Sequence, residues 1–159
     1  MREKRNLLPF SLNARDMMGQ KLKILLVEDN HEHLKLTKYI FARQKDPGEL
    51  FVVRDGQEAI DYLYRRNKYV DANSSPRPNL VLLDLNIPRI GGKEVLRIIK
   101  TDQNLKDIPV IVVSSSDREE DVKYAFECGA AAYISKADGF EKLSEALSSI
   151  HTYASPGKA

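Results

Sequence analysis

The sequence has one cysteine, Cys128, and no tryptophan among its 159 residues. A single cysteine excludes an intramolecular disulfide framework and a cysteine-built zinc site, and it is typical of a reducing compartment. No apolar run approaches the roughly 20 residues that a transmembrane helix needs, and the N-terminus lacks the apolar core of a signal peptide. We therefore expect a cytoplasmic protein that is neither exported nor inserted into a membrane.

An excess of charge of either sign is also missing. The chain carries 25 Lys and Arg against 23 Asp and Glu, which gives a formal net charge of +2. This balance provides neither the basic surface of a nucleic-acid-binding protein nor an acidic tail, so we expect no nucleic-acid partner. With 42% hydrophobic residues, the chain can form one domain with a substantial core.

Five short apolar runs alternate along the chain with segments of helical apolar spacing. The central runs are apolar at consecutive positions, as parallel strands covered on both faces are. The sequence therefore predicts an α/β domain with a doubly wound parallel sheet and five βα units. The predicted strands are 23–27, 50–54, 79–84, 109–114 and 131–135.

The two ends of the sequence lack this alternation. Residues 1–21 show no sustained periodicity, and we expect a flexible extension there. Residues 22–152 carry all the βα units, and residues 153–159 form a tail too short for a second domain. The last predicted helix has an apolar face at three- and four-residue intervals, made by Phe140, Leu143, Leu147 and Ile150.

Polar side chains stand at the ends of four predicted strands. Glu28 and Asp29 follow the first strand, Asp84 ends the third, and Ser114 ends the fourth. Because the carboxyl ends of parallel strands meet at one edge of an open sheet, where ligands bind, we expect these groups to converge. Lys136 follows the fifth strand, where its charge can pair with Asp84.

The neighbouring carboxylates of this predicted site repel each other unless a cation lies between them. Mg2+ is the favoured ion, because it prefers oxygen ligands and commonly bridges carboxylates to a phosphate. Glu28, Asp29, Asp84 and a nearby backbone carbonyl would provide such ligands. Considered alone, the Glu28-Asp29 pair also fits an exposed turn in which Asn30 caps the next helix.

Two histidines close to these acids, His31 and His33, suggest a metal-binding or phosphorelay pair. Residues two apart on a helix point to different faces, however, so we assign neither of them to a site. Cys128 lies late in a helical pattern, directly before Gly129, and we expect it to be a small packing residue.

Taken together, these residues make the chain similar to the receiver domain of two-component response regulators over about residues 22–152. The similarity implies a flavodoxin-like, five-stranded parallel sheet of the (βα)5 type with the strand order 2-1-3-4-5. It also implies a signalling protein that assists its own phosphorylation and is not an enzyme. The residues that carry the similarity are Glu28, Asp29, Asp84 with Pro88 and Gly92, Ser114 thirty positions after Asp84, Tyr133 and Lys136.

The resemblance implies a phosphoacceptor and a metal site. In receiver-like proteins the aspartate that matches Asp84 accepts a phosphoryl group from a histidine kinase. The groups that match Glu28, Asp29, Asp84 and the backbone carbonyl of Asn86 bind Mg2+. The Asp84 carboxylate would attack phosphorus, with catalysis arising mainly from positioning and electrostatics.

The resemblance also implies a switch. Ser114, Ser115, Tyr133 and Lys136 match positions that bind the phosphoryl group or respond to it. Ser114 would turn to donate a hydrogen bond to the phosphoryl group, and Tyr133 would move into the space that Ser114 leaves. The surface formed by the fourth helix, the fifth strand and the fifth helix would change, which biases a two-state equilibrium.

A finer resemblance is to the small regulators that are partnered with bacterial phytochromes. It rests on the proline-containing loop from Tyr69 to Asn79, the run Pro-Asn-Leu-Val-Leu-Leu-Asp-Leu-Asn at 78–86, and the lack of a second domain. It implies a sensor histidine kinase, of the phytochrome type, or a phosphotransfer protein as partner. It also implies a homodimer through the face that includes the last helix and the fifth strand.

Two positions depart from the receiver pattern. Ala137 follows Lys136, where many receivers have a proline that is preceded by a cis peptide bond. A cis bond to a non-proline residue costs roughly 3 kcal/mol, and a trans bond could shift Lys136. Glu28 stands where aspartate is commoner, and its extra methylene is expected to alter the metal shell. A constitutive, unphosphorylated interaction module therefore stays open as an alternative.

Two further functions compete with signalling. The Asp84-Leu85-Asn86 run is superficially similar to the Asp-x-Asp of haloacid dehalogenase phosphohydrolases. Those enzymes carry the nucleophile on an early strand and a second acid where Asn86 stands. A flavin- or nucleotide-binding module shares the fold class. The first βα turn has no glycine-rich phosphate cradle, and no Walker or G-x-G-x-x-G pattern occurs, so the sequence favours the receiver.

Overall fold

The computed structural model describes residues 21–149, apart from residue 46. The predicted tail 153–159, the predicted extension up to residue 20, and Ile150 lie outside this part. Strands and helices alternate along it as expected. They are β2 (Lys23–Val27), α1 (His31–Ala42), β3 (Glu49–Val53), α2 (Gly56–Leu63), the 3-10 helix η2 (Asn67–Tyr69), β4 (Leu80–Leu83), α3 (Gly92–Thr101), β5 (Val110–Ser114), α4 (Glu119–Cys128), β6 (Ala132–Ser135), the 3-10 helix η3 (Lys136–Asp138) and α5 (Phe140–Ser148).

The five strands form one parallel sheet in the order β3-β2-β4-β5-β6. This is the predicted order 2-1-3-4-5, so the fold prediction is confirmed. No strand boundary differs from its prediction by more than one residue. β3 ends at Val53 because the next backbone N–H, that of Arg54, donates to Glu58 Oε1 (2.8 Å) at the start of α2 and leaves the strand ladder.

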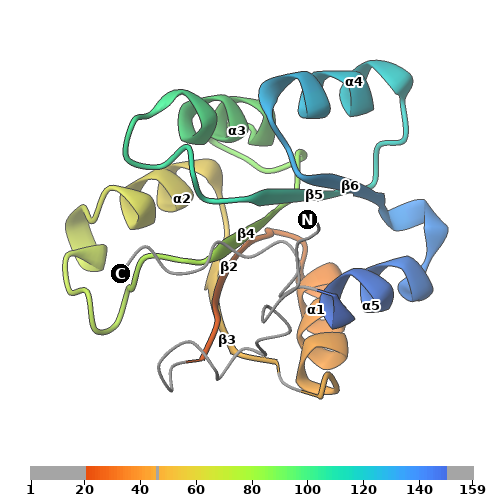
Figure 1. Ribbon diagram of the computed structural model, residues 1–159, viewed down its shortest axis with the longest axis horizontal. Coiled ribbons are helices and arrows are strands. Elements are labelled where there is room, and N and C mark those ends of the chain that lie inside the picture. The colour runs from red at the N-terminus through yellow and green to blue at the C-terminus, as the bar shows by residue number, and fades with distance from the viewer. Residues whose placement is uncertain (1–20, 46, 150–159) are drawn as a thin grey trace, which may run out of the picture.

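Helices cover both faces of the sheet, with α1 and α5 on one face and α2, α3 and α4 on the other (Figure 1). Alternate strand residues divide the core accordingly. Leu25 and Val27 of β2 pack on the side of α2–α4, whereas Ile24 and Leu26 pack on the side of α1 and α5. Leu143 and Leu147 of α5 are buried there, as the apolar face of the last helix predicts. Within the described part of the chain, no helix is long and apolar enough to cross a membrane.

Candidate functional site

The strand register places Glu28 and Asp84 beside each other. Val27 at the end of β2 is paired with Leu83 at the end of β4. One residue further on, the N–H of Asp84 donates to the Val27 carbonyl and the N–H of Glu28 donates to the Val53 carbonyl, each at 3.1 Å. The backbone on both sides is therefore fixed, and the two acids are 2% and 5% exposed.

Lys136 provides the positive charge between these acids. Its Nζ donates to Glu28 Oε1 at 2.6 Å and to Asp84 Oδ2 at 3.0 Å, and the side chain is 15% exposed. The register of β5 and β6 pairs Ser114 with Ser135, so Lys136 begins η3 directly at the sheet edge. The described residues contain no cis peptide bond, and Lys136 reaches both acids from a trans peptide at Ala137.

His33 joins Glu28, Asp84 and Lys136 in one cluster, although the sequence analysis assigned it to no site. Its Nδ1 lies 2.8 Å from Lys136 Nζ and 3.9 Å from Glu28 Oε2. His31 is exposed and lies outside the cluster, as expected for histidines two residues apart on a helix. That spacing excludes a histidine pair but does not exclude a single histidine. Among the described residues, Glu28, His33 and Asp84 each offer a ligand atom within 4.8 Å of the other two.

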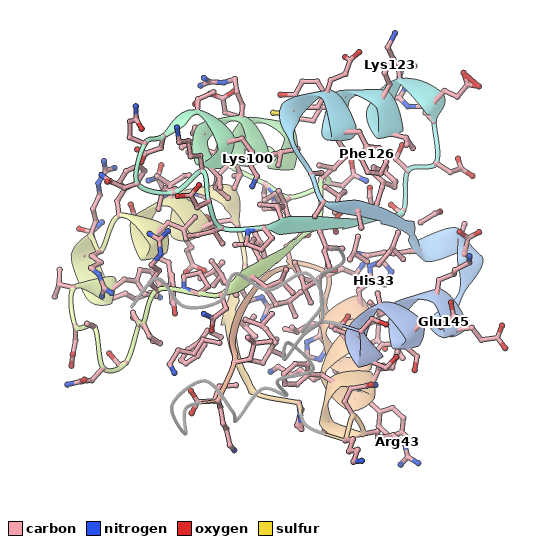
Figure 2. All side chains as sticks on the ribbon, in the orientation of Figure 1. His33, Arg43, Lys100, Lys123, Phe126 and Glu145 are labelled. Atoms are coloured by element: carbon pink, nitrogen blue, oxygen red, sulfur yellow. The ribbon has the colours of Figure 1, made fainter. Side chains whose placement is uncertain are left out.

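The position of His33 follows from how α1 begins. Asn30 caps the helix, and its Oδ1 accepts a hydrogen bond from the His33 N–H at 2.9 Å. Side chains in the first turn of a helix lean towards its N-terminus, which here adjoins the end of β2. Figure 2 shows His33 at the end of α1 that is closest to the sheet. Burial, together with the charge of Lys136, lowers the pKa of His33.

The remaining predicted metal ligands lie close by without joining this cluster. Asp29 is half-buried, and its backbone carbonyl accepts a hydrogen bond from the Arg54 side chain at 3.3 Å. Its negative charge partly opposes the lowering of the His33 pKa. The N–H of Asn86 donates to Asp84 Oδ1 at 3.0 Å, so its backbone adjoins the acid. The Asn86 side chain donates to the Oγ of the exposed Ser115 at 3.2 Å.

Ser114 and Tyr133 are linked through Ser116, a residue that the sequence interpretation did not identify. The fully buried Ser114 accepts a hydrogen bond on its Oγ from the Ser116 N–H at 3.1 Å. The Tyr133 hydroxyl donates to the Ser116 carbonyl at 2.6 Å, and the Ser116 hydroxyl donates to Asp121. Ser116 therefore connects the loop after β5 with Tyr133 of β6 and Asp121 of α4, and we call these contacts the Ser116 junction.

Asp121 anchors this junction to α3 as well. It is 4% exposed, lies 2.6 Å from Lys93 Nζ of α3, and lies 3.3 Å from Arg118 Nε. Hydrogen bonds from Lys93 and Ser116 hold the pKa of Asp121 well below its ordinary value. The sequence contained one signal for it, because Asp121 precedes the buried Ala125 by four residues and so shares the core-facing side of α4.

Comparison with known proteins decides the family. The response regulator receiver domain model matches residues 24–148. The chain belongs to the response regulator receiver domain family. Receiver domains interact with histidine kinases or phosphotransfer proteins and bind Mg2+ or Mn2+ in an acidic pocket, and in this receiver the acidic cluster is the one formed by Glu28 and Asp84.

Individual relatives are similar over most of the receiver. The response regulator Rcp1 of Synechocystis sp. is 37% identical over 130 residues, which are 82% of this chain and 86% of Rcp1. The crystal structure of the Mn2+-bound form of Rcp1 has a TM-score of 0.73 at 36% identity, and covers 83% of this chain and 93% of that one. The crystal structure of the phosphorylated cyanobacterial phytochrome response regulator RcpA also has a TM-score of 0.73, at 39% identity. The match covers 83% of this chain and 92% of RcpA.

Proposed function

We propose that this receiver accepts a phosphoryl group on Asp84 in a Mg2+-dependent reaction and signals through a changed protein-binding surface, without being an enzyme. A sensor histidine kinase or a phosphotransfer protein would donate the group. The observation that carries the proposal is the pair of buried carboxylates, Glu28 and Asp84, with Lys136 Nζ within 3.0 Å of both. The phosphorylated form of RcpA and the Mn2+-bound form of Rcp1 support it.

The side chains present fit a divalent cation. Two buried carboxylates face each other across a positive charge, the Lys136 ammonium, so a cation is already stabilised between them. Glu28 and Asp84 would hold the ion, together with Asp29 and the backbone carbonyl of Asn86. When bound, Mg2+ would neutralise negative charge on the oxygens of the phosphoryl group.

The protein's own groups orient the nucleophile. Asp84 Oδ1 accepts from the Asn86 N–H and Oδ2 accepts from Lys136, so the carboxylate plane is fixed from two sides. One oxygen of Asp84 would form the new bond to phosphorus while the donor's phosphorus bond breaks. Lys136 would then stabilise the negative phosphoryl oxygens, and the Ser114 hydroxyl would donate a hydrogen bond to one of them.

The output would pass through the Ser116 junction. Ser114 accepts from the Ser116 N–H, so a turn of Ser114 towards the phosphoryl group would disturb that hydrogen bond. Ser116 is also hydrogen-bonded to Tyr133 of β6 and to Asp121 of α4. The surface of α4, β6 and α5 would respond, and we propose that it also forms a homodimer. Phe126 of α4, 49% exposed, offers an apolar contact there (Figure 2).

The first test is phosphorylation by a small donor. Incubation with Mg2+ and acetyl phosphate is expected to add one phosphoryl group, detected by intact mass, and Asp84→Asn is expected to abolish the adduct. Size-exclusion chromatography of the same samples tests dimerisation, which predicts earlier elution of the phosphorylated protein. A phytochrome-type kinase and an unrelated sensor kinase, compared as donors, test the proposed partner.

Other outcomes would favour the competing functions. A folded protein that binds Mg2+ yet gains no adduct from acetyl phosphate or a kinase would indicate a constitutive interaction module. Repeated turnover of a small phosphomonoester such as p-nitrophenyl phosphate, lost in Asp84→Asn, would indicate a phosphohydrolase.

The affinity for Mg2+ is expected to depend on pH through Glu28. Burial, reinforced by the charge of Asp84 and opposed by the Lys136 hydrogen bond, raises the pKa of Glu28 to about 7. Because the ion must displace the proton that Glu28 binds below this pH, the affinity should fall about tenfold from pH 8 to pH 6. Calorimetric titration at both pH values measures this. In Glu28→Gln the same comparison should show a much flatter dependence.

A further inference from the structure

His33 presents an electron pair to the cluster. A lysine ammonium can only donate hydrogen bonds, so the 2.8 Å contact with Lys136 Nζ makes His33 Nδ1 the acceptor and leaves the ring proton on Nε2. The nitrogen that faces Glu28 and Asp84 is therefore the unprotonated one. An imidazole in this form is a metal ligand without further proton loss.

The distances around Lys136 Nζ suit replacement of the ammonium by a metal ion. Nζ lies 2.6 Å, 2.8 Å and 3.0 Å from Glu28 Oε1, His33 Nδ1 and Asp84 Oδ2. Bonds from a divalent ion to oxygen or nitrogen are about 2.1 Å, so three donors must each close by less than about 1 Å. His33 Nδ1 lies 3.9 Å from Glu28 Oε2, within the span of about 4.2 Å that two opposite ligands of one ion have.

We propose that His33 is a nitrogen ligand of this metal site, binding the ion when the ion displaces the Lys136 ammonium from the two carboxylates. The proposal rests on the divalent-cation site of the proposed function and adds a ligand to it. Imidazole binds Zn2+ and Ni2+ more strongly than Mg2+, which prefers oxygen alone. His33 therefore shifts the preference of the site away from Mg2+ and towards ions that bind imidazole.

Two titrations of the untagged full chain test the metal preference. Zn2+ and Mg2+ are titrated separately into the wild type, His33→Ala, His33→Asp and the matched control His31→Ala, which changes an exposed histidine of the same helical turn. His33→Ala is expected to weaken Zn2+ about tenfold and to leave Mg2+ nearly unchanged. His33→Asp makes the set all-oxygen and should strengthen Mg2+, while His31→Ala should leave the ratio of the two affinities at the wild-type value.

The nitrogen itself can be observed directly. In a long-range 1H–15N spectrum, Zn2+ is expected to shift His33 Nδ1 strongly and to leave His31 at its free position. An unmoved Nδ1 in a protein that binds Zn2+ through Asp84, or an unchanged affinity ratio in His33→Ala, would overturn the proposal. Both results are separable from failure of the proposed function, which would appear as the absence of a Mg2+-dependent phosphoryl adduct on wild-type protein.

Discussion

Gly92→Ala is expected to destabilise the protein by about 3 kcal/mol, because its added methyl group would overlap the backbone of Asp84 and Leu85 in the loop after β4. A Cβ at Gly92 would lie 2.4 Å from the Asp84 carbonyl oxygen and 2.4 Å from Leu85 Cα. The Gly92 N–H also donates to the Leu85 carbonyl at 3.0 Å, so α3 begins in direct contact with the residues after β4. Relief of the overlap must move the backbone of Asp84. Urea unfolding measures the loss of stability, and the rate of phosphorylation by acetyl phosphate should fall as well.

Gly91→Ala is the matched control for this prediction. A Cβ at Gly91 meets no atom within 4 Å, and its backbone angles, φ −68° and ψ 158°, suit alanine. Alanine there is expected to change stability by less than about 1 kcal/mol, since its restriction of the unfolded chain is opposed by its poorer capping of α3. Equal effects of the two substitutions would show that contact with the Asp84 loop is not what requires glycine at position 92.

The sequence was sufficient to predict the sheet and the residues at its carboxyl edge. Consecutive apolar residues mark β2, β4 and β5 because both faces of these strands are buried. Parallel pairing then brings the residues that follow the strands together whatever their separation in sequence. Glu28, Asp84 and Lys136 accordingly meet within hydrogen-bonding distance although 108 positions separate the first from the last.

The sequence was insufficient where a side chain's direction decides the outcome. His33 joins the cluster because the first turn of α1 leans back over the end of β2, whereas Asp29, although adjacent to Glu28, lies outside the group of close ligand atoms. Ser116 and Asp121 are polar residues in a loop and a first helical turn, where such residues are common. Their role depends on Lys93, which comes from another helix, and the spacing of Asp121 and Ala125 indicates only the buried side of α4 and not this partner.

Lys136→Met is expected to make the fold depend on a divalent cation. Removal of the ammonium leaves Glu28 and Asp84 buried without a counter-charge, and breaking such a pair costs about 3 kcal/mol. Mg2+ should restore much of this stability and bind more tightly than to wild type, since no ammonium competes for the carboxylates. Urea unfolding at pH 8, with and without Mg2+, measures both effects. Lys68→Met is the control, because Lys68 is 69% exposed and pairs with Glu58 at the surface, so no comparable change is expected.

The pH dependence of the Lys136→Met effect identifies the acid involved. The pKa of Glu28 is raised from its ordinary value of 4.5 to about 7 in the folded protein. The folded state therefore binds this proton more tightly than the unfolded state, and the associated stability is complete below pH 4.5 and lost as the pH rises through 7. The variant should accordingly lose less stability at pH 5, where Glu28 is protonated, than at pH 8. When Lys136→Met is introduced into Glu28→Gln, the stability that it removes at pH 8 should fall towards the stability that it removes at pH 5. A loss of equal size at both pH values would indicate that Lys136 stabilises the fold through its ion pair with Asp84 and not by neutralising Glu28.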